Sequence, residues 1–91
     1  MSFNATGEYL KHRRNELGLT QQEVSLEVGD LHSQFVSNWE RGLCLPPEWA
    51  WPKLNKVLKL HPLLIRSHLR TDYAEKADEY VKRVLKVKTL K

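Results

Sequence analysis

Cysteine and long apolar runs are nearly absent from this sequence. Cys44 is the only cysteine among its 91 residues, which excludes an internal disulfide and the zinc sites built on paired cysteines. No apolar run reaches the roughly 18 residues that a membrane helix needs, and the first residues form no basic-then-apolar signal segment. We therefore expect a cytoplasmic protein that holds no metal and no cofactor and makes no contact with a membrane.

Motifs of catalytic and nucleotide-binding sites are missing too. The chain has no G-x-S-x-G elbow, no P-loop and no glycine-rich dinucleotide loop. Its four histidines show no metal-binding spacing such as H-E-x-x-H, and its single cysteine lacks a recognisable base. These absences argue against an enzyme.

Basic charge gathers in the last third of the chain. The net charge is +4, yet residues 1–60 carry seven Lys or Arg against seven Asp or Glu, whereas residues 61–91 carry eight against four. Five of those eight lie between positions 82 and 91. Such a basic end is typical either of a solvated tail or of an arm that binds phosphate groups. Net charge alone is therefore a weak argument for binding DNA.

Helix start and end signals recur along the chain, and no strand-like alternation of useful length occurs. This pattern predicts an all-α fold. The first helix is expected to begin near Thr6 and to end at Gly18, and Thr20 with Glu23 forms a capping box that starts the second. Further glycines are expected to end the second and third helices, namely Gly29 and Gly42.

Prolines mark the expected helix starts in the second half of the chain. Pro52 and Pro62 suit the first turns of a fourth and a fifth helix. Trp49 and Trp51 lie in a proline-rich link with Pro46, Pro47 and Pro52, and they are expected to fix this link to the core rather than to stack on bases. We expect a compact bundle of five helices with an extra or extended C-terminal helix.

The C-terminal segment, residues 61–91, is predicted to be helical. Neither Gly nor Pro occurs between positions 63 and 85, so one long helix or two helices broken near Thr71 and Asp72 would fit. Apolar residues at spacings of three and four form a heptad-like seam over Tyr73, Ala77, Tyr80, Val84 and Val87. We expect this segment either to pack on the unit formed by residues 1–60 or to form a dimer interface.

A short stretch in the first half carries the pattern of two crossed helices. Gln21, Ser25 and Gly29 follow one another at intervals of four, and Val36 and Trp39 lie three apart in the next helix. A small residue is needed where helices cross, glycine permits a left-handed turn, and the apolar pair anchors the second helix. This pattern resembles the helix-turn-helix of the Cro and phage-repressor, or XRE-type, family. The resemblance extends over roughly residues 7–60.

Carried over residue by residue, the resemblance implies that a helix over about residues 33–41 lies in the major groove of duplex DNA. The side chains implied to face base edges are Ser33, Gln34, Ser37 and Asn38. Glutamine and asparagine amides can bond to adenine N6 and N7, and serine hydroxyls suit several bases. Phe35 either touches a thymine methyl or packs on the preceding helix. The turn before this helix is one residue longer than is usual in the family. The first residue of the helix is therefore fixed only to within about one position.

The resemblance also implies residues that hold the DNA backbone and one pair that holds the fold. The implied phosphate contacts are Gln21, His32 and Arg41. For His32 the alternative is a helix cap, and for Arg41 a surface salt bridge. Arg14 and Glu40 match a largely buried ion pair of the family, whose loss would leave an uncompensated charge.

The sequence thus predicts a sequence-specific transcriptional regulator that binds double-stranded DNA. We expect a repressor that acts as a homodimer on a pseudo-palindromic operator with half-sites about one helical turn apart. The alternative is a protein-partner module, such as an antitoxin that grips a toxin through residues 63–88 and also represses its own operon.

Overall fold

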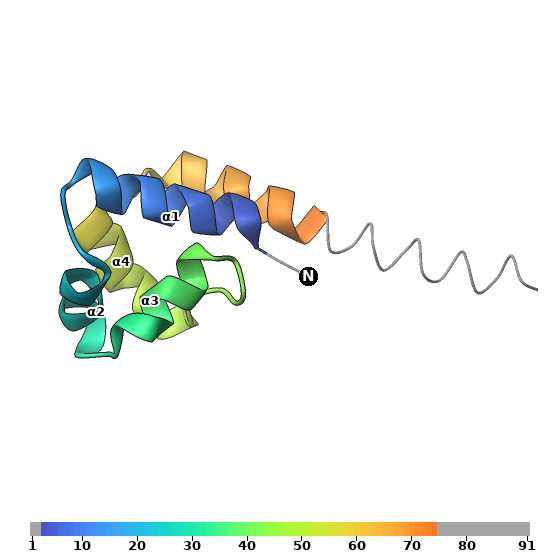
Figure 1. Cartoon of the computed structure of the whole chain (residues 1–91). Coiled ribbons are helices and arrows are strands. Elements are labelled where there is room, and N and C mark those ends of the chain that lie inside the picture. Colours follow the sequence, from blue (N-terminus) through green and yellow to red (C-terminus); the bar gives the residue numbers. More distant parts are fainter. Residues whose placement is uncertain (1–2, 75–91) are drawn as a thin grey trace, which may run out of the picture.

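A computed structural model describes residues 3–74 of the chain. These residues form helices and no strand, which confirms the all-α prediction. A further helix covers residues 62–74. Figure 1 shows the bundle. The elements before residues 62–74 are α1 (Asn4–Glu16), α2 (Gln21–Gly29), α3 (Ser33–Glu40), a 3-10 turn η1 (Glu48–Ala50) and α4 (Trp51–Leu58).

One apolar core joins the four labelled helices. The helix ends agree with local signals, because Gly18 and Gly42 have the positive φ values, 70° and 75°, that glycine adopts freely. Trp51 packs against the core as expected, whereas Trp49 is 57% exposed and lies outside the core, with its ring against Gly29. The buried apolar side chains are Leu10, Val24, Val28, Val36, Trp39, Ala50, Leu54, Leu58 and Leu60.

The turn between α2 and α3 differs from the prediction in one residue. Asp30, and not Gly29, adopts the left-handed conformation, with φ 55° and ψ 41°. Gly29 remains in the helix, where the Trp49 ring lies so close that a Cβ at this position would be 3.3 Å from it. The longer turn thus moves the left-handed residue one place on, to an aspartate, which tolerates that conformation better than most side chains. Leu31 N–H then closes the turn on the Ser25 carbonyl at 3.1 Å.

Residues 62–74 pack along α1. The buried carboxylate of Asp72 accepts hydrogen bonds from the backbone N–H groups of Ala5 at 3.0 Å and Thr6 at 2.9 Å. At the middle of this helix, the ring of His68 lies 4.9 Å from that of Tyr9. Figure 1 shows the two helices side by side at one edge of the bundle. A carboxylate from the far end of the fold therefore caps the start of α1.

This capping also accounts for where α1 begins. The helix begins at Asn4, two residues before the predicted start, although its N-cap residue Phe3 makes no side-chain cap. The helix over residues 62–74 runs through Thr71 and Asp72 without a break. The apolar seam after Tyr73 and the basic end lie outside the described residues. Among residues 3–74, no helix has the length and apolar character required to cross a bilayer.

Candidate nucleic-acid interface

The helix α3 separates apolar anchors from a polar face. Val36, Trp39 and Glu40 are buried, and they occupy one side of the helix. Gln34 and Asn38, four residues apart, occupy the opposite side, and the Gln34 Nε2 donates to Asn38 Oδ1 at 2.9 Å. This face therefore presents two amide side chains that are hydrogen-bonded to each other.

The remaining predicted base-contacting residues flank this pair. Ser33 and Ser37 are half-buried on the same helix. His32 is the N-cap of α3, because its Nδ1 accepts the Gln34 N–H at 3.0 Å. With Nδ1 accepting, a neutral imidazole carries its proton on Nε2, where it can donate to a phosphate oxygen. The cap and the implied phosphate contact are therefore compatible roles for His32.

The α2 helix holds α3 at a close crossing. Ser25 is fully buried, and its hydroxyl donates to the Gln22 carbonyl at 2.8 Å, so a small side chain fills the crossing without an unpaired polar group. At the start of α2, Thr20 Oγ1 accepts the Glu23 N–H at 3.0 Å and Glu23 Oε1 accepts the Thr20 N–H at 2.8 Å. The hydrogen bond from the Thr20 backbone N–H, and after it the Thr20 side chain, lower the pKa of the Glu23 carboxyl. The predicted capping box is thus present, and it sets where α2 begins.

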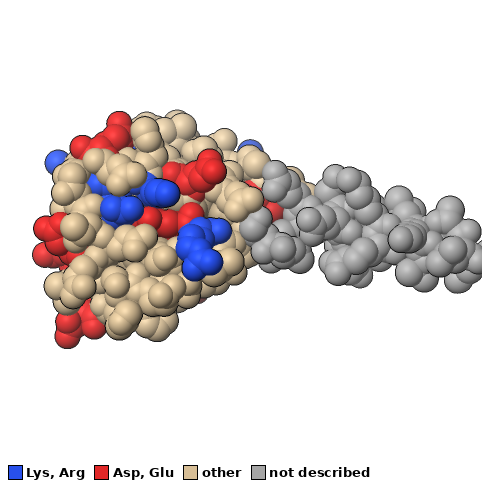
Figure 2. All heavy atoms as spheres, in the orientation of Figure 1, with Lys and Arg blue, Asp and Glu red and all other residues tan. Residues whose placement is uncertain are grey.

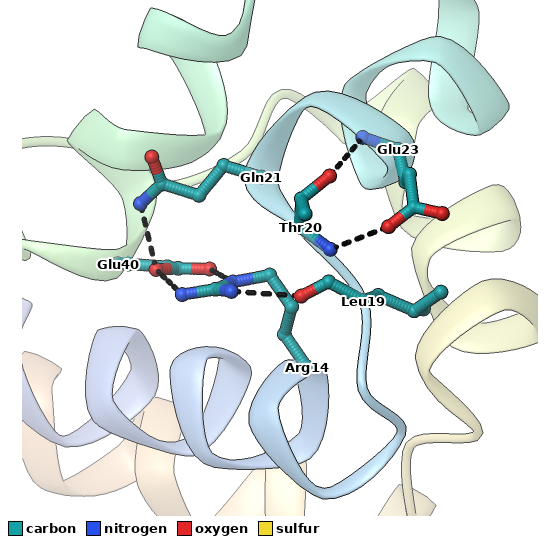
Figure 3. Close-up of polar contacts among 6 residues, drawn as sticks. All are labelled: Arg14, Leu19, Thr20, Gln21, Glu23 and Glu40. Carbon is teal, nitrogen blue, oxygen red and sulfur yellow. Dashed lines mark hydrogen bonds and ion pairs between the residues drawn. The ribbon is translucent and has the colours of Figure 1, made fainter.

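An ion pair ties α1 to the end of α3. Arg14 Nε donates to Glu40 Oε2 at 2.5 Å and Arg14 Nη2 donates to Glu40 Oε1 at 3.1 Å. Their side chains are only 12% and 3% exposed. Arg14 Nη1 also donates to the Leu19 carbonyl at 2.8 Å, so the guanidinium bridges the α1–α2 link as well (Figure 3).

Gln21 completes this cluster from the first position of α2. Its Nε2 donates to Glu40 Oε1 at 3.0 Å, as Figure 3 shows. The side chain is half-buried, so this hydrogen bond directs its amide toward Glu40. The backbone N–H groups in a first helical turn have no partner within the helix and suit a phosphate oxygen. We therefore expect the phosphate contact at Gln21 to involve the main chain of α2 as well as the amide.

A hollow of about 450 Å³ opens beside the cluster, between α1, the start of α2 and the end of α3. Its walls carry two basic and two acidic residues, but the charge of Glu40 is compensated by Arg14, so one positive charge is left over. The lining residues are Asn4, Glu8, Lys11, Gln21, Ser37, Glu40 and Arg41. Elsewhere, basic and acidic side chains are interspersed on the face in Figure 2, as expected from the balanced charge of residues 1–60. Among the described residues, this face thus carries no broad basic patch.

Lys11 is a candidate phosphate contact that sequence reasoning missed. It lies three residues before Arg14, hence on the same face of α1, and it lines the hollow together with Gln21 and Arg41. That spacing could have pointed to it. Among residues 3–74, no three histidine, cysteine, aspartate or glutamate side chains are grouped so that they could bind a metal ion.

A family model described as helix-turn-helix matches residues 10–48. This range runs from α1 through both crossed helices to the start of η1. Residues 10–48 are thus similar to a helix-turn-helix domain. The match confirms the resemblance to the XRE-type family that the Gln21 to Trp39 pattern predicted. Comparison with curated proteins and with solved structures gives no match.

In a helix-turn-helix, the second helix of the motif lies in the major groove and the first crosses the DNA backbone. The helices of this chain that match the first and second helix of the motif are α2 and α3. The buried residues of α3 face the domain, and the Gln34 and Asn38 pair is on the side left open. The family supports DNA binding and transcription regulation in general.

Arg41→Ala is expected to weaken binding to every duplex and to flatten its salt dependence. Each phosphate contact contributes about 0.9 to the slope of log K against log salt, so the slope should fall by about that amount. Titration of a labelled duplex at several salt concentrations measures it. Lys56→Ala, which removes an exposed lysine on α4, is the matched control. An unchanged slope for Arg41→Ala would remove this residue from the phosphate contacts.

Proposed function

We propose that this protein is a sequence-specific repressor of transcription that binds its operator as a homodimer. The observation that supports this most directly is the amide pair on α3, formed by exposed Gln34 and half-buried Asn38 on the side opposite the anchors Val36 and Trp39. Amide side chains on a groove-binding helix can read base edges through paired hydrogen bonds. The proposed contacts with base edges are Ser33, Gln34, Ser37 and Asn38, and those with phosphates are Gln21, His32 and Arg41, with Lys11 added.

Size supports the homodimer. A single module of this kind offers a small footprint on DNA, and pairing two copies doubles both the contacts and the selectivity. Two-fold symmetry then requires a pseudo-palindromic site with half-sites about one helical turn apart. A dimer bound to an operator excludes other proteins from that DNA, and this exclusion is the simplest route to repression. A cytoplasmic location belongs to the same proposal.

Selection of bound sites from random duplex DNA tests this proposal. We expect one enriched motif with two-fold symmetry, and two chains per duplex when the complex is weighed by light scattering. A selection that enriches no motif would contradict sequence-specific binding. A single asymmetric site occupied by one chain would contradict the homodimer.

Gln34→Ala tests whether the amide pair reads sequence. Each good amide–adenine pair contributes about 1–3 kcal/mol of discrimination, so the variant should lose its preference for adenine at one position of the half-site. Its affinity for unrelated duplexes should stay close to that of the wild type, because phosphates supply most non-specific binding. Competition binding with single-base variants of the selected site measures both. Equal loss on all sequences would show that Gln34 is not a base reader.

A protein-partner role is the second candidate, and exposed apolar side chains on residues 62–74 favour it. Leu63 and Tyr73 are more than half exposed there. Such side chains suit a protein surface, either a second copy or another protein such as a toxin. A stoichiometric partner that is captured by wild type and lost from a Leu63→Glu variant would support this candidate over simple self-association.

A further inference from the structure

One large apolar side chain lies exposed on the recognition helix. Phe35 is 52% exposed, although it is flanked by polar Gln34 and buried Val36. The two interpretations that the sequence left open were packing on the preceding helix and contact with a thymine methyl. Val36 and Trp39, each 3% exposed, are the residues of α3 that pack in the core. Phe35 therefore does not serve as a core residue of the crossing.

The position of Phe35 relative to the amide pair limits what it can contact. Successive residues of a helix point about 100° apart and differ by 1.5 Å in height. Phe35 and Gln34 therefore point in different directions from the same turn, and on DNA they would meet neighbouring base pairs rather than the same one. Asn38, three residues after Phe35, lies on the next turn of the helix. Its side chain points in a direction between those of Gln34 and Phe35.

The hydrogen bond between Gln34 and Asn38 gives Asn38 a positioning role beside its proposed contact with a base edge. Gln34 Nε2 donates one hydrogen to Asn38 Oδ1 at 2.9 Å. The glutamine then keeps its Oε1 acceptor and one N–H donor, the pair of groups that matches adenine N6 and N7. Asn38 thus holds the Gln34 amide in a fixed orientation, beside an aromatic ring on the same helix.

We propose that Phe35 is a specificity-determining residue, which packs on the C5-methyl group of a thymine next to the base pair read by Gln34. This inference rests on the proposed function of α3 as a groove-binding helix. The thymine methyl is the one apolar group that the four bases present in the major groove, and the other edges are hydrogen-bonding atoms. A half-exposed phenyl ring gains by covering that methyl and loses by covering a polar edge.

Replacing single thymines by deoxyuridine in the selected operator tests this directly, because it removes the methyl group and nothing else. For the wild type we expect affinity to fall about fourfold at one thymine of each half-site, the effect of one buried methyl group. Phe35→Ala should bind the two duplexes equally at that position. Phe35→Leu, which keeps an apolar side chain, should retain part of the difference.

Leu64→Ala is the matched control. Leu64 is 48% exposed, close to the value for Phe35, but lies on residues 62–74, away from α3. This variant should keep the wild-type response to deoxyuridine at every position. Since Phe35 is not in the core, Phe35→Ala should also keep the wild-type melting temperature.

Two results would overturn the inference and leave the proposed function intact. One is a wild type that binds selectively but responds to no thymine replacement, and the other is a Phe35→Ala variant that keeps the wild-type response. A wild type that selects no duplex sequence at all would instead overturn the proposed function, and the inference with it.

Discussion

Replacing Glu40 by alanine is expected to lower the free energy of unfolding by about 3–5 kcal/mol, the loss seen when one partner of a buried ion pair is removed. The Glu40 carboxylate accepts two hydrogen bonds from Arg14 and one from Gln21, and its side chain is 3% exposed. Without it, the Arg14 guanidinium stays in a largely buried place with one neutral acceptor, the Leu19 carbonyl. For a small domain this is a large part of the total stability.

Thermal and urea unfolding of the free protein measure this loss. Glu16→Ala provides the matched control, because Glu16 also pairs with an arginine, Arg13 at 2.6 Å, but at an exposed position. Exposed pairs of this kind contribute little, so that variant should melt close to the wild type. If Glu40→Ala and Glu16→Ala melt alike, the buried Arg14–Glu40 pair contributes no more to stability than the exposed Arg13–Glu16 pair.

The second large effect is expected at Asp72. Its carboxylate is fully buried and accepts the N–H groups of Ala5 and Thr6. Hydrogen bonds to a charged group contribute about 1.5–3 kcal/mol each, so Asp72→Ala should cost about 3 kcal/mol or more. The loss should be concentrated at the start of α1, where two donors lose their acceptor.

Hydrogen exchange distinguishes this local effect from general destabilisation. The amides of Ala5 and Thr6 should exchange much faster in Asp72→Ala than in the wild type, beyond the change seen in the α2 amides. Thr71→Ala, at the exposed neighbouring position on the same helix, should leave both melting and exchange nearly unchanged. Unchanged protection of the two α1 amides in Asp72→Ala would contradict the cap.

The cap also links the helix over residues 62–74 to the end of α3. Phe3, at the N-cap of α1, donates its N–H to the Gly42 carbonyl at 2.8 Å. Gly7 lies so close to the end of α3 that a Cβ there would be 2.5 Å from the Glu40 carbonyl oxygen. The start of α1 is thus packed between Asp72 and the last residues of α3. Loss of the Asp72 cap should therefore reduce the order of α3 as well as that of α1.

Much of the helix-turn-helix could be predicted from local sequence. The Thr20 and Glu23 capping box and the left-handed glycines at 18 and 42 depend on residues within a few positions of each other. The buried anchors Val36 and Trp39 follow from helical spacing in the same way. The predictions that failed depend on other parts of the chain. Gly29 keeps helical geometry beside the Trp49 ring, and the left-handed turn falls on Asp30.

What the amino-acid sequence determined by itself is the set of helices, the capping box of α2 and the polar face of α3, because each depends on residues only a few positions apart. Tertiary structure alone decided where α1 begins and which charged side chains meet around the hollow between α1, α2 and α3. Asp72 reaches α1 across 67 positions, and Lys11 and Arg41 meet around one hollow only after three helices have packed. No local pattern encodes such contacts, since their free energy is gained only when distant segments exclude water together.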